Sequence, residues 1–285
     1  MRWESGRKSS NIEDRRGSRM PGGFKGGGIA ILLLALVGMY FGIDPSVILN
    51  LGGQLQGDRP STSMEYTPTE EEKQLADFVA VVLADTEETW HQQFQQLGGS
   101  YAEPTLVLFS AAVQSACGFA QAATGPFYCP ADQKVYIDLS FYQELKDKMN
   151  APGDFAQAYV IAHEIGHHVQ NLLGILGKVQ AARGQLPETE YNKLLVRLEL
   201  QADCLAGVWA NHADRARQVV EPGDIDEALN AASQIGDDRL QQQSRGYVTP
   251  DSFTHGTSEQ RTRWFKQGYV RGDFNSCDTF AAKQL

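Results

Sequence analysis

The feature that most constrains the fold is an apolar segment from Asp154 to Leu173 in which two histidines are embedded. Its apolar residues recur every three or four positions, which predicts one helix with a buried side, ended at Gly174. His163 and His167 are four positions apart, so their imidazoles project from one face of that helix, one turn apart. Because burying unpaired imidazoles is costly, this helix requires a partner for both rings.

The spacing of the two histidines suits a metal ion. Nitrogens one helical turn apart can both reach one Zn²⁺ ion at about 2.0–2.1 Å. Glu164 follows the first histidine, where a carboxylate can hold a zinc-bound water molecule and take its proton. Gly166 would let another element come close to the helix. The motif therefore predicts a catalytic centre with one zinc ion and Glu164 as general base. A chance match on a solvated helix face is the alternative.

A second helical pattern, over residues 191–210, offers the missing ligand. A catalytic zinc site takes three protein ligands and leaves the fourth position to water. Glu199 and Asp203 lie four positions apart among apolar residues of this segment. One carboxylate can then bind the metal while the other accepts a hydrogen bond from a ligand histidine. We assign Glu199 to zinc and Asp203 to the far N–H of His163. A solvent-facing acidic stripe is the alternative.

Strand patterns precede the two helices. Residues 125–130 and 134–140 predict a hairpin with its turn near 132–133, and alternation places Val135, Ile137 and Leu139 on one face of the second arm. The other predicted elements are a helix from 67–71 to about residue 97, a strand over 104–109, a loop over 115–125 and mainly helices after Phe141. The fold class is therefore α+β, mainly helical with a small antiparallel sheet.

The four cysteines are Cys117, Cys129, Cys204 and Cys277, and they form no C-x-x-C pair. This argues against a thiolate zinc knuckle or a thioredoxin-type site. In an oxidising compartment an even number of cysteines predicts two disulfides, with three connectivities. We favour Cys117–Cys129 with Cys204–Cys277. Four buried reduced thiols are the alternative.

His-Glu-x-x-His followed by Glu-x-x-x-Asp resembles the gluzincin peptidases, and Glu199-Leu-Gln-Ala-Asp203 resembles an element of the membrane-associated CAAX-processing peptidases. Over nearly its whole length the chain is more similar to the bacterial putative neutral zinc metallopeptidase family. The stretches that carry this similarity are 115–120, 125–136, the His163 helix, 254–261 and 268–280. The resemblance implies a zincin-like fold and a protein or peptide substrate. It also implies an edge strand that binds the substrate backbone, for which residues 134–140 are the candidate.

His255 is the second candidate catalytic residue. Thr254-His255, with Arg261 six positions later, resembles the Thr-His-Pro…Arg element of CAAX-type peptidases, with Gly256 in place of proline. A histidine or arginine near the metal can stabilise the oxyanion formed during hydrolysis. Alternatively, residues 254–261 only cap the last helix. His168 points about 100° away from His167 around the helix and is predicted to be structural.

The distribution of charge predicts a membrane anchor. The net charge of −10 argues against a nucleic-acid partner, but residues 1–25 carry seven Arg or Lys against three acids. An uncharged apolar run over 26–43 follows, near the lower end of the about 17–25 residues that span a bilayer. We therefore expect a single-pass protein of the bacterial inner membrane. Residues 1–25 would be cytoplasmic, 26–43 a transmembrane signal anchor, 44–71 a flexible linker, and 72–285 a zinc metallopeptidase domain in the periplasm or outside the cell. A core helix or a cleaved signal peptide is the alternative, but the run shows neither a polar face nor a cleavage site.

The predicted function is zinc-dependent hydrolysis of peptide bonds, by an endopeptidase. Glu164 would take the proton of the zinc-bound water and return it to the leaving amine, and His255 would donate to the oxyanion. The alternatives are a zinc-binding scaffold or chaperone-like protein that does not cleave, and a structural zinc site closed by a fourth ligand such as His255. An intact Glu164 favours hydrolysis, because a protein that only binds has no need of a general base.

Overall fold

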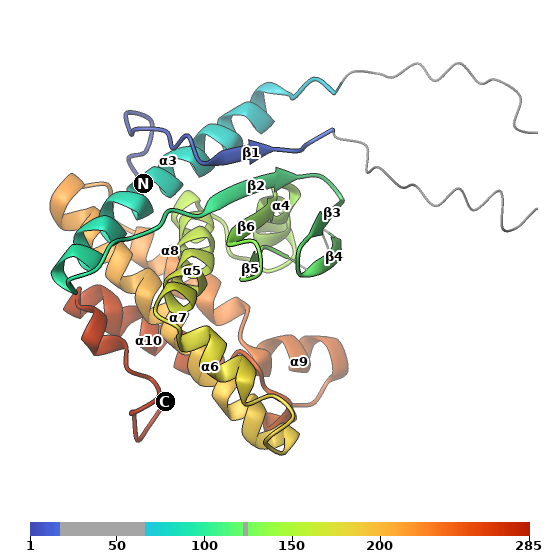
Figure 1. Cartoon of the computed structure of the whole chain (residues 1–285). Coiled ribbons are helices and arrows are strands. Elements are labelled where there is room, and N and C mark those ends of the chain that lie inside the picture. Colours follow the sequence, from blue (N-terminus) through green and yellow to red (C-terminus); the bar gives the residue numbers. More distant parts are fainter. Residues whose placement is uncertain (18–65, 122–124) are drawn as a thin grey trace, which may run out of the picture. The chain divides into compact units, whose positions relative to one another are not determined.

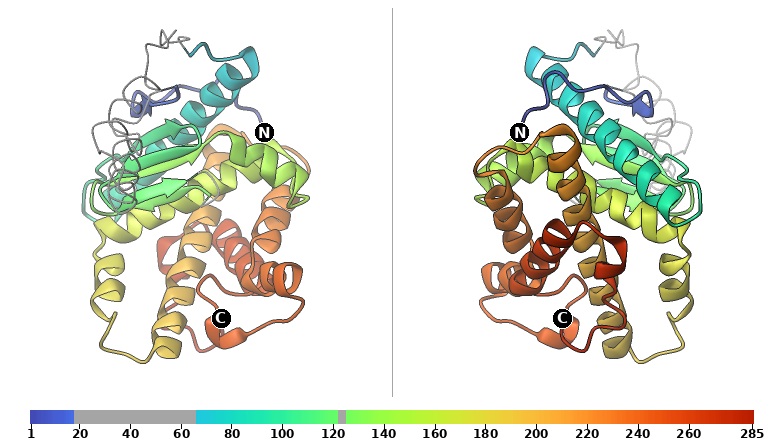
Figure 2. Two further views of the ribbon diagram at one scale, coloured as in Figure 1. Left: turned by 90° about the vertical axis from the view of Figure 1, so that its right-hand side faces the viewer. Right: turned by 90° about the vertical axis from the view of Figure 1, so that its left-hand side faces the viewer.

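The structure is a computed structural model that describes residues 1–17, 66–121 and 125–285. Within it, Met1–Arg16 and Pro68–Leu285 form one compact unit. Figure 1 shows a small sheet on one side of this unit and a set of helices on the other. In both views of Figure 2 the sheet lies at one end and the C-terminal helices lie toward the opposite end.

The main sheet has four strands. Their order is β1 (Ile12–Asp14), β2 (Thr105–Phe109), β6 (Lys134–Asp138) and β5 (Phe127–Cys129). β5 and β6 pair antiparallel, so the predicted hairpin is confirmed. The strand predicted over 104–109 is confirmed as β2. β1–β2 and β2–β6 are parallel, however, so the sheet is mixed and not antiparallel as predicted. The reason is that the chain crosses over between β2 and β6, so both strands enter the sheet in the same direction.

A second hairpin lies within that crossover, where the sequence predicts a loop over 115–125. It consists of β3 (Ala112–Ser115) and β4 (Gly118–Gln121), paired antiparallel. The glycines and alanines of this stretch resemble a loop by composition, but the disulfide Cys117–Cys129 holds the hairpin turn against β5. The second disulfide is Cys204–Cys277, so the favoured pairing is confirmed.

Side chains of β2 and β6 alternate between two cores, as expected for strands. The residues that join the helices in the main core are Leu106, Leu108, Val135, Ile137 and Leu139. The residues that pack against the β3–β4 hairpin are Val107, Phe109 and Tyr136. The predicted alternation in the second arm of the hairpin is therefore confirmed, and the sheet is buried on both faces.

Eight helices and two short 3₁₀ turns make up the rest of the described unit. They are α3 (Glu70–Gln96), α4 (Ser140–Asp147), α5 (Asp154–Leu172), α6 (Ile175–Ala181), α7 (Glu188–Arg217), α8 (Asp224–Gln234), α9 (Asp237–Arg245), η2 (Pro250–Ser252), α10 (Ser258–Arg271) and η3 (Phe274–Cys277). Thr69 and Glu72 form a capping box at the start of α3. Gly174, in the left-handed region with a φ of 72°, follows the end of α5 as the sequence predicts.

α7 and α10 cross at very short range. A Cβ placed on Gly268 would lie 1.9 Å from the carbonyl oxygen of Cys204, and one on Gly207 would lie 2.0 Å from that of Phe265. Only glycine permits this approach at either position. The crossing brings Arg261 of α10 against the buried face of α7 that carries Asp203.

The structure overturns the predicted membrane topology. No helix within the described ranges is both long and apolar enough to cross a membrane, and residues 26–43, the predicted anchor, lie outside those ranges. The basic N-terminal segment also lies on the body, because β1 pairs with β2 and the Arg16 Nη1 donates to the carbonyl oxygen of Glu72 at 3.0 Å. A strand that shares a sheet with the body cannot lie across a bilayer from it. The predicted cytoplasmic arm and single-pass location are therefore wrong, and the described residues give no support to the predicted transmembrane helix.

Candidate metal centre

α5, which carries the histidine motif, packs against α7 (Figure 1). A Cβ on Gly166 would lie 3.0 Å from the carbonyl oxygen of Ala202 and 3.1 Å from its Cα, so the absence of a side chain lets α7 come close. The predicted close approach at Gly166 is therefore confirmed. The approaching turn of α7 is the one that carries Glu199 and Asp203.

Three side chains from these helices converge. His163 Nε2 lies 3.2 Å from Glu199 Oε2, and His167 Nε2 lies 3.4 Å from Glu199 Oε1. One ligand atom from each of the three residues falls within 4.8 Å of the others. In the described part of the chain, the ion-pair partners of Glu199 are these two imidazoles alone. Two imidazole nitrogens and a carboxylate, from one buried and two half-buried residues, fit a zinc ion.

A buried network on the far side of His163 fixes that ring. Its Nδ1 lies 2.9 Å from Asp203 Oδ1, which also accepts hydrogen bonds from the Tyr159 hydroxyl at 2.5 Å and the Arg261 Nη2 at 2.9 Å. The Arg261 Nε donates to Asp203 Oδ2 at 2.8 Å. Asp203 is completely buried. The carboxylate that accepts three donors on one oxygen therefore directs Nδ1–H of His163 toward itself and leaves Nε2 for a metal.

The sequence predicts the contact between Asp203 and His163 but not Tyr159 or the role of Arg261. Arg261 is 2% exposed and bonds to Asp203, Tyr159 and the carbonyl oxygen of Ile235, so its guanidinium is not directed at a substrate. The predicted cap is also present, because Thr257 forms a capping box at the start of α10. A polar residue in an apolar helix, such as Tyr159 one turn before His163, is the signal that could have identified this network.

Charges within the network shift the pKa values of its members in opposite directions. Burial lowers the pKa of His163, but the charge of Asp203 and its hydrogen bond outweigh burial and raise that pKa to about 10. Burial raises the pKa of Asp203, but the positive charges of Arg261 and His163 outweigh it and lower that pKa to about 2. The pKa of His167 is raised as well, since the charge of Glu199 outweighs burial.

Zinc binding is expected to release protons and to become tighter as pH rises toward 10. The imidazole of His163, whose pKa is about 10 in the metal-free protein, is protonated at neutral pH and must lose the Nε2 hydrogen before it can bind a metal. Calorimetric titration with Zn²⁺ in two buffers of different ionisation enthalpy measures the protons released. Equal apparent enthalpies in both buffers would contradict the prediction.

The same shifts set how the stability of the metal-free protein depends on pH. The folded pKa of His163 is raised from 6.5 to about 10, so its contribution is complete below pH 6.5 and is lost as pH rises through 10. The folded pKa of Asp203 is lowered from 3.8 to about 2, so its contribution is present above pH 3.8 and is lost as pH falls through 2. The two groups together therefore stabilise the metal-free fold most between about pH 3.8 and pH 6.5.

Glu164 and His255 are the two remaining residues of the predicted site: Glu164 follows His163 on α5, and His255 lies between η2 and α10. Glu164 is buried on α5, and its carboxylate has no hydrogen-bond partner among the described residues. The side chain of His255 is 51% exposed, and its Nδ1 lies 3.0 Å from the Thr254 hydroxyl and 3.3 Å from Asp237 Oδ1. Partial burial lowers the pKa of His255, but the hydrogen bond to Asp237 and the charge of Glu199 raise it overall. His255 is not part of the three-ligand group.

His168 belongs to the packing of the fold. Its Nε2 donates to the carbonyl oxygen of Ala102 at 2.6 Å, and its Nδ1 accepts from the Tyr128 hydroxyl at 3.0 Å. Burial lowers the pKa of this ring, and Tyr128 also accepts from Asn171 at 3.0 Å. His168 therefore joins α5 to β5, as expected of a structural histidine.

The predicted substrate-binding strand is mostly paired within the sheet. It contains β6, whose residues 134–136 pair with both β2 and β5 and so have no backbone groups left for a substrate. Ile137 and Asp138 pair with β2 alone. In the described sheet β5 lies at the edge, and it is also the strand joined to α5 by Tyr128.

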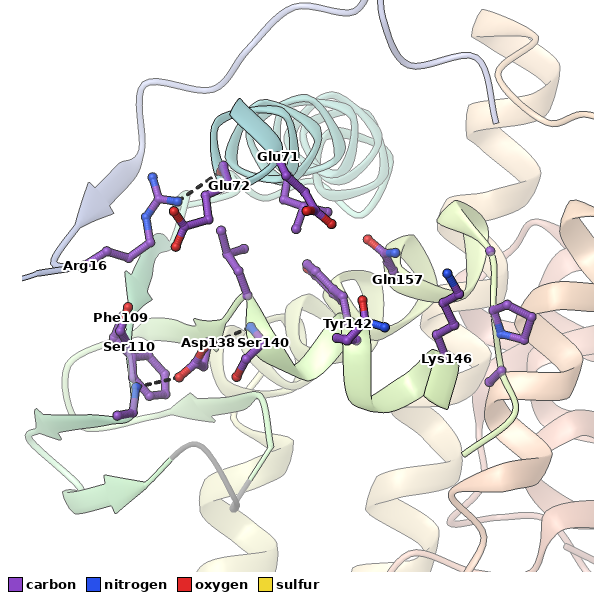
Figure 3. Close-up of a pocket in the computed structure, with 17 residues that line it drawn as sticks. Arg16, Glu71, Glu72, Phe109, Ser110, Asp138, Ser140, Tyr142, Lys146 and Gln157 are labelled. Atoms are coloured by element: carbon purple, nitrogen blue, oxygen red, sulfur yellow. Dashed lines mark hydrogen bonds between the residues drawn. The ribbon is translucent and has the colours of Figure 1, made fainter. Parts of the chain in front are cut away.

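A cavity of about 660 Å³ lies apart from the metal centre, where β2 and β6 end (Figure 3). Asp138 accepts hydrogen bonds there from the backbone N–H groups of Ala111 at 2.6 Å and Ser140 at 2.9 Å. Arg16 and Tyr142 also line it. No residue of the three-ligand group lines this cavity, so it is a separate feature of the fold.

Two adjacent helices that present two imidazoles and a carboxylate, with a further glutamate beside them, define a site of the zinc peptidase class. Residues 1–280 match the family described as "Putative neutral zinc metallopeptidase", and the chain belongs to that family. Zinc is the metal that this membership implies, and hydrolysis is the activity it suggests.

Similar proteins occur in distant bacteria. The chain is 51% identical over 291 residues to "Uncharacterized protein YpfJ" of Escherichia coli (strain K12), covering 98% of this chain and 99% of the relative. It is 40% identical over 258 residues to "Uncharacterized protein Rv2575" of Mycobacterium tuberculosis (strain ATCC 25618 / H37Rv), covering 87% and 86%. No solved structure matches the chain.

Proposed function

We propose that the protein is an endopeptidase that hydrolyses peptide bonds with one zinc ion held by His163, His167 and Glu199. The observation that carries the proposal is the convergence of both Nε2 atoms on the Glu199 carboxylate, at 3.2 and 3.4 Å. A site with three protein ligands leaves a position open, which is typical of catalytic and not of structural zinc. His255 stays outside the group, which favours an open site over one closed by a fourth protein ligand.

Glu164 is the general base of the proposed reaction. Zinc, when bound, supplies a Lewis acid that polarises the peptide carbonyl and makes a water molecule more acidic. The Glu164 carboxylate is buried beside the ligands and has no hydrogen-bond partner among the described residues, so it is available to accept the proton of the attacking water. The same carboxyl group then delivers that proton to the leaving nitrogen.

His255 stabilises the negative charge that develops on the carbonyl oxygen. The hydrogen bonds of its ring are made by Nδ1, to Thr254 and Asp237, and within the described residues Nε2 has no partner. The raised pKa favours the charged ring, whose Nε2–H can donate to an oxyanion. Asp237 holds the ring by its Nδ1, and Asp237 Oδ2 also accepts from the backbone N–H of His255 at 2.6 Å.

A protein or peptide in extended conformation is the proposed substrate. β5 is an edge strand of the described sheet, and Tyr128 at its centre is hydrogen-bonded to His168 and Asn171 of the active-site helix. A substrate backbone that pairs with β5 would therefore be held beside that helix. This places the substrate strand on β5 in place of β6.

The full chain with zinc is expected to cleave casein or members of a peptide library. A chelator should stop the cleavage, and added Zn²⁺ should restore it. The measurement is the appearance of new peptides by mass spectrometry, with a His163→Ala variant as the control for a contaminating protease. A wild-type protein that binds zinc and cleaves none of these substrates would favour the non-cleaving scaffold or chaperone-like protein.

A further inference from the structure

We infer that Gln170 is a positioning residue for the ligand His167, and that the backbone carbonyl of Cys277 sets its orientation through Gln201. The inference rests on the proposed function only in that His167 and Glu199 are taken as metal ligands. It assigns a role to two glutamines that the sequence motif does not include. It also connects the C-terminal disulfide to the metal centre.

The chain of hydrogen bonds starts at a group that can only accept. The carbonyl oxygen of Cys277 receives a hydrogen bond from the Gln201 Nε2 at 3.0 Å. Because a carbonyl has no hydrogen to donate, the amide of Gln201 must turn its nitrogen toward Cys277. Its oxygen, Oε1, is then directed to Gln170, whose Nε2 lies 3.1 Å away.

The amide of Gln170 is fixed in the same way. Its Nε2 donates to Gln201 Oε1 and, at 2.7 Å, to the carbonyl oxygen of Leu198. With both N–H groups used, Gln170 Oε1 is left to face His167 Nδ1, at 2.9 Å. An oxygen that faces Nδ1 requires a hydrogen on that nitrogen. When the ring of His167 is neutral, its lone pair is therefore on Nε2, the atom 3.4 Å from Glu199.

Burial keeps the amides of Gln170 and Gln201 on these hydrogen-bond partners. Gln170 is fully buried and Gln201 is 4% exposed, so solvent does not offer alternative partners. Leu198, whose carbonyl accepts from Gln170, directly precedes Glu199 in α7. One amide therefore orients the ligand His167 on α5 and holds the turn of α7 that carries the ligand Glu199.

The C-terminal segment holds the start of the chain of hydrogen bonds in place. Cys277 is buried and is bonded covalently to Cys204 of α7. The Thr279 hydroxyl donates to the carbonyl oxygen of Arg197 at 2.6 Å, and the Arg197 Nη1 donates to the carbonyl oxygens of Thr279 and Ala282. The carbonyl of Cys277 is thus fixed relative to α7 and, through Gln201 and Gln170, determines which nitrogen of His167 is free.

The test uses the full chain, three variants and Zn²⁺ alone. Gln170→Met and Gln201→Met keep the side-chain length and remove the amide. Gln93→Met is the matched control, because Gln93 is also a buried glutamine, 4% exposed, whose Nε2 lies 3.0 Å from a histidine outside the metal centre, His212. Zinc affinity is measured by competition with a chromophoric chelator. The tautomer of His167 is measured by ¹⁵N NMR of the zinc-loaded protein.

Gln170→Met should weaken zinc binding by about 10–100-fold, the usual effect of removing a partner of a ligand histidine. Gln201→Met should weaken it less, and Gln93→Met should leave it within roughly twofold of wild type, since Gln93 contacts no ligand. In wild type the NMR spectrum should show hydrogen on Nδ1 of His167 and metal on Nε2. Gln170→Met should expose that Nδ1 hydrogen to faster exchange with water, which a merely structural role would not change.

Each outcome decides the inference. Equal zinc affinities of Gln170→Met and Gln93→Met, or metal bound at Nδ1 in wild type, would overturn it. If Gln170→Met does not fold, Gln201→Met decides, because Gln201 contacts no ligand directly. A wild type that binds zinc but cleaves nothing removes the proposed function and leaves the inference standing. A wild type that binds no zinc removes both.

Discussion

Replacing Glu164 with glutamine is expected to lower kcat by about 10²–10⁴-fold, the contribution usual for a general base, while zinc stays bound. Glutamine has nearly the same shape but cannot accept the proton of the attacking water. His163, His167 and Glu199 are unchanged, so the metal affinity should stay close to that of wild type. The measurement is a peptide cleavage assay on zinc-loaded protein, with metal content determined on the same sample.

Glu259→Gln is the control for this variant, because it makes the same chemical change on an exposed residue of α10. Its kcat should equal that of wild type. A Glu164→Gln protein that retains zinc and cleaves at the wild-type rate would remove Glu164 from the mechanism. Loss of zinc together with activity would instead show that Glu164 helps to hold the metal.

Replacing Asp203 with leucine is expected to destabilise the fold by about 3–5 kcal/mol, the cost of leaving a buried charge without its partner. Arg261 is 2% exposed and makes two hydrogen bonds to this carboxylate, so its charge would stay buried and uncompensated. Urea denaturation of the metal-free protein measures the free energy of unfolding. Zinc affinity should fall as well, because His163 loses the acceptor of its Nδ1 hydrogen.

A double-mutant cycle separates the two effects. Arg261→Met alone should also destabilise, whereas Asp203→Leu combined with Arg261→Met should recover much of the lost stability, since no charge remains unpaired. Zinc affinity should not recover in the double variant, because the acceptor for His163 is still missing. If both single variants unfold at the wild-type urea concentration, the buried ion pair contributes nothing and this account of the network is incorrect.

The three candidate metal ligands and Asp203 could be brought together from the sequence because helical periodicity is local. Residues four positions apart lie on one face whatever the rest of the chain does, so His163 with His167, and Glu199 with Asp203, form pairs in each helix. The apolar surroundings of each pair then imply that the two faces meet. The hairpin of β5 and β6 was predictable for the same reason, since both strands and their turn are contiguous.

What the sequence did not reveal depends on contacts between distant segments. β1 has only three residues, and about 90 residues separate it in the sequence from its partner β2, so no local pattern connects the two strands. The position of β6 inside the sheet follows from its parallel pairing with β2, which periodicity does not show. The amides of Gln170 and Gln201 face each other only because α5 and α7 pack together. A basic segment before an apolar run favours a membrane anchor until that segment is seen to pair with the body.

The pairing of β1 with β2 also bears on aggregation and on the order of folding. Without residues 12–14, the hydrogen-bonding groups along one side of β2 would face solvent, and an open edge of this kind recruits strands from other chains. The protein's own N-terminal segment therefore covers this edge of β2 and leaves only the three-residue β1 at that end of the described sheet, and very short edge strands recruit other chains poorly. Closing this parallel pair brings together residues far apart in the sequence, so it forms at the entropic cost of a long loop. The opposite edge of the sheet, by contrast, belongs to β5, which is held by a local hairpin and a disulfide. That edge can therefore form as soon as the hairpin does.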